Sequence, residues 1–225
     1  MTRKLIVKVC GMRDGENIRP VAELGVDWIG MIFWPKSPRH VTMIPSYAGI
    51  IPDRGSLSFT DHQLSPKRVG VFVDEMAQNI ITRVVNFQLD LVQLHGHETP
   101  TLIRNLRRTL ADIRPVKFIK AISVASRDDI ETYKDYVDCV DYFLFDTKCP
   151  TVGGSGNQFD WSVLADYDGE TPFLLSGGIG PDDAERVKAF HHTKCIGIDL
   201  NSRFEIEPAL KDINKLREFI KEIQL

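Results

Sequence analysis

The stretch Leu5-Ile-Val-Lys-Val-Cys-Gly-Met-Arg-Asp-Gly15 bears most directly on the fold. Its apolar half, residues 5–9, is typical of a buried β-strand. In a dinucleotide-binding fold the next turn would carry G-x-G-x-x-G, whereas here it reads Cys10-Gly-Met-Arg-Asp-Gly15. The chain also lacks G-x-x-x-x-G-K-[ST], the motif of P-loop proteins. The stretch therefore argues against an open, doubly wound sheet.

Seven more apolar runs follow this first strand, at intervals that each leave room for a helix and two loops. They occupy residues 28–33, 68–73, 91–94, 116–122, 142–145, 173–175 and 195–198. Runs that are largely apolar suit the strands of a parallel sheet, which are buried on both faces. Eight such units in 225 residues predict an α/β fold, a single (β/α)8 TIM barrel over residues 1–225.

Two segments outside the runs add detail to this architecture. Apolar residues at helical spacing predict a last helix over residues 208–223. The interval between the second and third runs is the longest, and it is polar and rich in Gly, Pro and Ser near residues 52–66. We expect a surface-loop insertion there, because a domain boundary would leave two βα units alone.

The composition restricts partners and location. The chain has 28 Lys and Arg residues and 31 Asp and Glu residues, a formal net charge of −3. No basic surface for nucleic acid is therefore predicted. No apolar run approaches the ~18 residues of a membrane span. The four cysteines form no C-x-x-C pair and are expected as free thiols in a reducing compartment. We therefore expect a cytoplasmic protein without nucleic-acid or membrane partners.

Three chemically useful side chains follow predicted strands, where the active site of a (β/α)8 barrel forms. Cys10 is either an inert buried thiol or a base or nucleophile. Asp146 is either a cap or, partly desolvated, a proton donor. Arg39, in a Ser-Pro-Arg turn, is either a surface cation or a clamp for a carboxylate.

Two loops of small residues follow the last two runs. Gly177 and Gly178 belong to Ser176-Gly-Gly-Ile-Gly180, and Asn201 and Ser202 come after the eighth run. Glycine backbone can approach a phosphate closely, and phosphate sites after strands seven and eight are common in this fold. In the context of a barrel, these loops predict a phosphate site rather than turns alone.

Two further motifs were weighed as parts of a site. His95 and His97 form one H-x-H pair without further ligands at telling spacings, so no metal site is predicted. The glycine-rich residues 153–156 are a lid, another phosphate wall or a flexible linker. The residues alone leave these three roles open.

Segments spread along nearly the whole chain resemble the phosphoribosylanthranilate isomerase family, whose members are (β/α)8 barrels. The resemblance rests on their order as well as their content. They include Lys8-Val-Cys-Gly11, Ser37-Pro-Arg-His-Val41, Gln93-Leu-His-Gly-His-Glu98, Leu144-Phe-Asp146, Gly153-Gly-Ser-Gly156, Leu175-Ser-Gly-Gly-Ile179 and Gly197-Ile-Asp-Leu-Asn-Ser202 with Glu205.

The resemblance implies an Amadori rearrangement of an aminoaldose phosphate to an aminoketose phosphate in tryptophan biosynthesis, with no metal or organic cofactor. It implies Cys10 as general base, Asp146 as general acid and Arg39 as the contact for the anthranilate carboxylate. The phosphate site would comprise Gly177, Gly178, Asn201 and Ser202. The expected partner is a small-molecule phosphosugar, and the expected assembly is a monomer or a homodimer.

The sequence departs from the family pattern at one place near the expected phosphate site. After Asn201-Ser202 the family usually has Gly-Val-Glu, whereas this chain has Arg203-Phe-Glu205. Two alternative functions are compatible with the sequence. One is another phosphosugar isomerase. A related isomerase of this kind has a two-aspartate arrangement, whereas the first strand of this chain ends in Cys10. The other is a non-catalytic phosphosugar-binding homologue.

Overall fold

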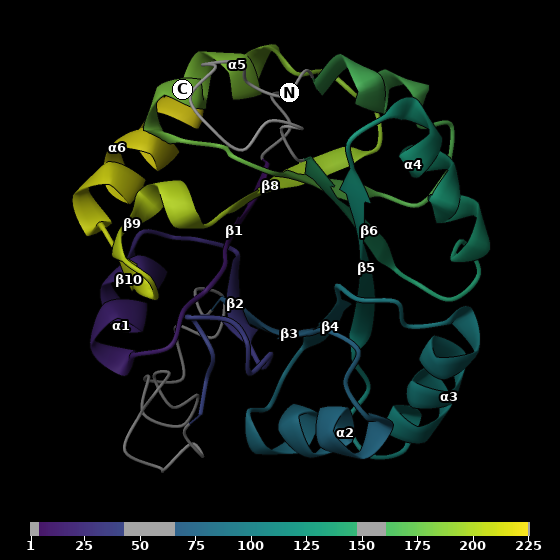
Figure 1. Ribbon diagram of the computed structural model, residues 1–225. Helices are drawn as coiled ribbons and strands as arrows, with labels where there is room; N and C mark the ends of the chain where they lie inside the picture. The colour runs from purple at the N-terminus through teal and green to yellow at the C-terminus, as the bar shows by residue number, and fades with distance from the viewer. Residues whose placement is uncertain (1–4, 43–65, 148–160, 225) are drawn as a thin grey trace.

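Eight parallel strands close into a barrel whose strand order is the sequence order (Figure 1). The computed structural model describes residues 5–42, 66–147 and 161–224. Closure is made by β1 and β8, which pair Lys8 with Asp199. The predicted barrel is confirmed. The strands are β1 (Ile6–Val9), β2 (Trp28–Ile32), β3 (Lys67–Phe72), β4 (Leu91–Leu94), β5 (Lys117–Val124), β6 (Tyr142–Thr147), β7 (Phe173–Ser176) and β8 (Cys195–Leu200).

Helices surround the barrel (Figure 1). Their apolar residues belong to the core that packs against the strands. In α3 these residues are Ile103, Leu106 and Leu110, and the Thr99 side chain caps the first turn. The α-helices are α1 (Gly15–Glu23), α2 (Ala77–Asn86), α3 (Pro100–Ala111), α4 (Arg127–Glu131), α5 (Ala184–Ala189) and α6 (Ile213–Ile223). The 3-10 helices are η1 (Thr132–Asp135), η2 (Trp161–Asp166), η3 (Pro181–Asp183) and η4 (Ser202–Phe204).

The apolar residues form two layers, one between strands and helices and one inside the barrel. The inner layer is filled by alternate strand residues. Toward the carboxyl ends of the strands some inward positions are polar or charged, among them Gln93, Asp146 and Asp199. The barrel is therefore a packed core with a polar mouth. The inner layer contains Trp28, Val69, Leu91, Ile119, Ala121, Leu144 and Leu174.

The predicted helix over residues 208–223 is wrong in its first part. A short antiparallel hairpin, β9 (Glu205–Glu207) and β10 (Leu210–Lys211), precedes α6. Ala209 turns the chain with a positive φ of 73°, which is incompatible with a right-handed helix. The Asp212 side chain then accepts hydrogen bonds from two backbone N–H groups and caps α6.

Two other expectations concern segments outside the described residues. The insertion near 52–66 lies outside them except for Pro66, and the glycine-rich residues 153–156 lie outside them entirely. Within the described ranges, every helix is too short or too polar to cross a membrane.

Candidate active site

A cavity of about 170 Å³ opens at the carboxyl ends of the strands. It is lined by the ends of β1, β6, β7 and β8, the position that the barrel fold favours for a site. Of the seven site residues that the sequence predicts, Arg39 is the one that does not line it. The other six are Cys10, Asp146, Gly177, Gly178, Asn201 and Ser202.

Cys10 lies directly after β1 and is held in the cavity wall. Its backbone N–H donates to the Leu200 carbonyl at 2.8 Å, and only 4% of its surface is exposed. Gly30 on β2 provides the room, because a Cβ atom there would lie 2.8 Å from the Cys10 Sγ. The Cys10 side chain is therefore held in one position.

A buried ion pair lies on the same barrel face as the thiol. Lys8 is two residues before Cys10, and its Nζ is 2.8 Å from the Asp199 Oδ1, with Lys8 fully buried. Burial lowers the pKa of Lys8, but Asp199 and Cys10 together raise it above its ordinary value. Lys8 is therefore a permanent positive charge near the thiol at neutral pH. The sequence indicated the shared face but not the partner.

The thiol itself keeps its proton more firmly than an ordinary cysteine. Burial raises the pKa of Cys10, and Asp199 adds to this effect. Lys8 and Lys211 act in the opposite direction without cancelling it. Cys10 is therefore chiefly a protonated thiol at neutral pH, and further positive charge close to it would favour the thiolate.

Asp146, on β6, has a histidine partner across the cavity wall. The Nε2 of His95 lies 3.3 Å from the Asp146 Oδ2, and the His95 backbone N–H donates to Phe72 O at 2.8 Å. The sequence motif suggests His95 only as a metal ligand together with His97. His97 instead lies 96% exposed and contacts Asp74. The described residues contain no cluster of three or more His, Cys, Asp or Glu able to hold a metal.

A buried carboxylate, which no sequence motif singles out, fixes the loop that carries His95. The Glu98 side chain accepts from Gly96 N at 2.9 Å and from Asp74 N at 3.0 Å. Its Oε2 is 3.2 Å from the Lys120 Nζ, which is almost fully buried. His95 therefore stands on a braced loop.

Gln93 is a second cavity residue that sequence reasoning missed. It faces inward from β4 two residues before His95, and 2% of its surface is exposed. Its Oε1 has no hydrogen-bond partner among the described residues. Buried polar atoms are usually satisfied, so this oxygen is suited to accept a hydrogen bond from a bound hydroxyl or amine.

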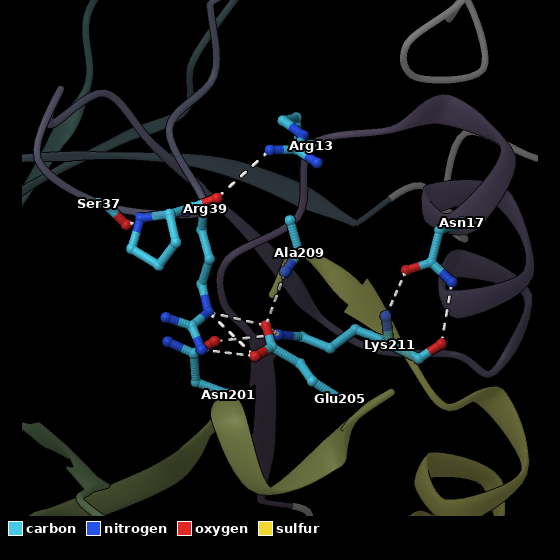
Figure 2. A network of polar contacts seen from close by, with 9 residues as sticks. Arg13, Asn17, Ser37, Arg39, Asn201, Glu205, Ala209 and Lys211 are labelled. Atoms are coloured by element: carbon cyan, nitrogen blue, oxygen red, sulfur yellow. Dashed lines mark hydrogen bonds and ion pairs between the residues drawn. The ribbon is translucent and has the colours of Figure 1, made fainter. Parts of the chain in front are cut away.

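Arg39 belongs to a polar network beside the cavity (Figure 2). Its Nε donates to the Glu205 Oε1 at 2.8 Å, and its Nη2 donates to Oε2 at 2.5 Å. The buried Lys211 Nζ donates to the same carboxylate at 2.6 Å and to the Asn201 Oδ1 at 2.9 Å. Burial would raise the pKa of Glu205, but Arg39 and Lys211 hold it below its ordinary value.

Gly11 is the point where this network meets β1. Its φ of +77° is one that L-residues rarely adopt. A Cβ atom there would lie 2.6 Å from the Arg39 Cδ and 2.7 Å from the Asn201 Oδ1. The residue after the thiol must therefore be glycine for two separate reasons, backbone angle and space.

The two predicted phosphate loops lie side by side in the cavity wall. Gly177 and Gly178 have φ values of 100° and 68°, which turn successive peptide groups in a way suited to an anion. The Gly180 N–H is held by the Asp183 carboxylate at 2.7 Å. Ser202 begins η4, a short 3-10 helix that follows the eighth strand. Asp146 pairs in the sheet with Ser176, so the glycine loop begins directly beside that carboxyl group.

Comparisons with known proteins agree on one family. The model of N-(5′-phosphoribosyl)anthranilate isomerase matches residues 7–222. A Parabacteroides distasonis protein of that name is 48% identical over 220 residues, covering 97% of this chain and 93% of its own.

Solved structures agree with the sequence comparisons. Phosphoribosyl anthranilate isomerase from Thermotoga maritima has a TM-score of 0.77 and 30% identity, and covers 98% of this chain and 99% of its own. A phosphoribosyl anthranilate isomerase in complex with reduced 1-(o-carboxyphenylamino)-1-deoxyribulose 5-phosphate has a TM-score of 0.75 and 29% identity, with the same coverage.

Proposed function

The chain belongs to the N-(5′-phosphoribosyl)anthranilate isomerase family, and we propose that Cys10 and Asp146 are the base and the acid of its reaction. The enzyme isomerises N-(5′-phosphoribosyl)anthranilate, an aminoaldose, to 1-(o-carboxyphenylamino)-1-deoxyribulose 5-phosphate, an aminoketose, in tryptophan synthesis. One observation carries the assignment of roles: a thiol from β1 and a carboxyl from β6 line one cavity.

The first step opens the furanose ring. Asp146 in its acid form donates a proton to the ring oxygen, and the bond from that oxygen to C1′ breaks. The nitrogen lone pair of the anthranilate forms the new C1′=N⁺ bond. His95 lies 3.3 Å from Asp146 and is suited to hold the carboxyl group in one orientation. General acids of this kind contribute about 10²–10⁴-fold to rate.

The second step removes the C2′ proton. The Cys10 thiolate accepts it, and the C2′–H electrons form C1′=C2′ while the iminium electrons return to nitrogen. This step runs from enzyme whose Cys10 has already lost its own proton to solvent, and the nearby iminium charge favours that form against the burial that raises the pKa of Cys10. The charge of Lys8 also acts to lower the pKa of Cys10.

The last step converts the enolamine to the ketone. C1′ gains a proton and the 2′-hydroxyl loses one, so the substrate neither gains nor loses protons overall. The Cys10 thiol and the Asp146 carboxylate then return to their starting forms. Every step is a proton transfer, and the proposal therefore requires no metal or organic cofactor.

Binding is proposed to use two groups of residues. Arg39 pairs with Glu205 through Nε and Nη2, which leaves its Nη1 side for the anthranilate carboxylate. Gly177, Gly178, Asn201 and Ser202 would take the phosphate. Anchoring the carboxylate and the phosphate holds C1′ and C2′ near the acid and the base, and such positioning contributes strongly to rate.

The test is an assay with substrate made in situ from anthranilate and phosphoribosyl pyrophosphate by a transferase. Loss of substrate fluorescence is followed for the wild type, Cys10→Ser and Asp146→Asn, with Cys139→Ser as a buried-thiol control. We expect rapid loss with the wild type and the control, and rates about 10²–10⁴-fold lower for the two site variants.

Two results would change the proposal. A folded wild type without turnover would favour a non-catalytic phosphosugar-binding homologue or a different isomerase. Full activity in Cys10→Ser or Asp146→Asn would keep the isomerase but remove the role given to that residue. Sedimentation of the same sample would decide between the two predicted assemblies, monomer and homodimer.

A further inference from the structure

Arg203 is the only arginine or lysine among the described residues that line the cavity. The carboxylates of the same wall are Asp146 and Asp199, and His95 is its histidine. Lys8 already balances Asp199 at 2.8 Å. A phosphorylated ligand that enters the described part of this cavity therefore meets one strong positive charge in its wall, and that charge is Arg203.

The backbone of Arg203 is fixed even though its side chain is exposed. It lies in η4 between Ser202 and the fully buried Phe204. The Phe204 ring packs edge-on against Phe219 with centroids 5.0 Å apart, and the Phe204 N–H donates to Asn201 O at 3.1 Å. The guanidinium is therefore carried on a rigid support at the rim of the cavity.

The side chain of Arg203 extends from the loop after β8 toward the loop after β7. A Cβ atom built on Gly180 would lie 3.6 Å from the Arg203 Cβ and 3.7 Å from its Cγ. The aliphatic stem thus lies beside the glycine loop that contains Gly177 and Gly178. These are the same two loops to which the phosphate is assigned.

We propose that Arg203 is an additional phosphate ligand, a charged contact that this chain adds to the backbone donors of the two loops. The proposal deepens the proposed function and rests on it, because the substrate supplies the phosphate. Glycine, which the family pattern has at this position, offers only a backbone N–H. Arginine adds a planar, permanently charged donor that suits phosphate oxygens.

A charged ligand at this position has three consequences for binding. Ligands with a dianionic phosphate gain affinity over the same ligands without phosphate. This gain weakens as salt is added, because Arg203 is exposed and its charge is screened. The chemical step between Cys10 and Asp146 is left unchanged, so the effect falls on KM rather than kcat.

The experiment compares Arg203→Gln and Arg203→Lys with Arg217→Gln, an exposed arginine of α6 outside the cavity. Calorimetry measures the binding of ribose 5-phosphate and of ribose, and the fluorescence assay gives KM and kcat. For Arg203→Gln we expect ribose 5-phosphate affinity and KM to worsen about tenfold, as for loss of one charge-assisted hydrogen bond at a partly exposed site. Arg203→Lys should recover part of this loss, and Arg217→Gln should match the wild type.

The outcomes separate this inference from the proposed function. Equal ribose 5-phosphate affinity in Arg203→Gln and wild type would overturn the role of Arg203, whatever the activity. A wild type that shows no affinity for ribose 5-phosphate would also overturn it. Binding that depends on Arg203 in a protein without turnover would leave this inference standing and remove the isomerase mechanism instead. Matching melting curves exclude a folding effect.

Discussion

One edge of the Arg39 guanidinium pairs with the Glu205 carboxylate, and the other edge takes no part in this pairing. The Nε–Oε1 and Nη2–Oε2 distances are 2.8 and 2.5 Å, so the pairing is side-on and the Nη1 group is not used in it. The carboxylate is 5% exposed and the arginine 18%. Glu205 thus acts as a positioning residue that fixes which face of Arg39 a ligand can reach.

Glu205→Gln should weaken substrate binding and stability together. Arg39 and Lys211 would share a neutral amide, and breaking a buried pair costs about 3–5 kcal/mol. We expect a higher KM and a lower midpoint of urea unfolding. Glu207→Gln, an exposed neighbour on the same strand, is the control and should leave both unchanged. A normal KM in Glu205→Gln would show that Arg39 needs no fixed orientation.

Gly11→Ala should disrupt the network that Gly25→Ala leaves intact. Both glycines have positive φ, 77° and 75°, so each substitution carries a backbone cost of about 1–2 kcal/mol. Gly25 has no atom within 4 Å of the new Cβ, whereas Gly11 meets Arg39 and Asn201. Overpacking at Gly11 adds about 1–3 kcal/mol. Thermal unfolding measures the difference, and equal losses would contradict it.

Lys8→Met should destabilise the barrel by leaving Asp199 without its partner. Loss of one member of a buried pair costs about 3–5 kcal/mol, while replacing both members by apolar groups is often neutral. The double variant Lys8→Met/Asp199→Leu should therefore recover stability in urea unfolding. Activity should stay low in both variants, because the charge beside Cys10 is gone. Full activity in the double variant would show that the pair serves folding alone.

His95→Asn should lower kcat more than it raises KM. His95 contacts Asp146 rather than the ends of the substrate, so its loss releases the acid from one orientation. We expect kcat to fall about tenfold, a fraction of what the acid itself contributes. His97→Asn is the matched control, since His97 is exposed and paired with Asp74. Steady-state kinetics decides, and equal kcat values for both variants would refute the role.

The pH profile should show the elevated pKa of Cys10. The groups that face this thiol are Lys8, Asp199 and Lys211, and burial outweighs them to raise its pKa. We expect kcat/KM, which reports the free enzyme, to rise with pH beyond the ordinary thiol range. In Lys8→Met the rise should shift further toward alkaline pH, because a charge that favours the thiolate is removed. A plateau already reached near pH 7 would contradict this.

The same thiol links stability to pH. A group whose pKa is raised on folding stabilises the native state below its unfolded pKa and loses this contribution as pH rises through its folded pKa. Wild type should therefore lose more stability than Cys10→Ser above about pH 9, starting near the ordinary pKa of a thiol. Thermal melts of both proteins across this range measure the difference.

The barrel was predictable because its strands are buried on both faces and read as apolar runs. β4 matches its predicted run, and the other strands differ from theirs by one or two residues at an end. The β9–β10 hairpin was not predictable in the same way. Leu210 fits the helical repeat as well as the apolar residues of α6 do. No local sequence signal indicates the positive φ of Ala209. A non-glycine turn of this kind depends on tertiary contacts.

The candidate site was predictable only where position in the fold decides it. Cys10 and Asp146 were identified because they end strands, and both line the cavity. Pairings between distant segments carry no local signal, which is why the contacts of Glu205 with Arg39 and of His95 with Asp146 were missed. Lys211 belongs to a polar stretch that gives no reason to expect a fully buried lysine.

Closure of the barrel pairs β1, which is translated early, with β8, which is translated late. Lys8 and Asp199 are separated by 191 positions, and ribosomes add about 5–20 residues per second. Cys10 thus leaves the ribosome roughly 10–40 s before Asp199 and Lys211, two of the three charges that act on it. During that interval the nascent chain carries Lys8 without its ion-pair partner and Cys10 without the cavity wall around it. Competence for catalysis is therefore a late event of synthesis, and early release of the chain yields no partial enzyme.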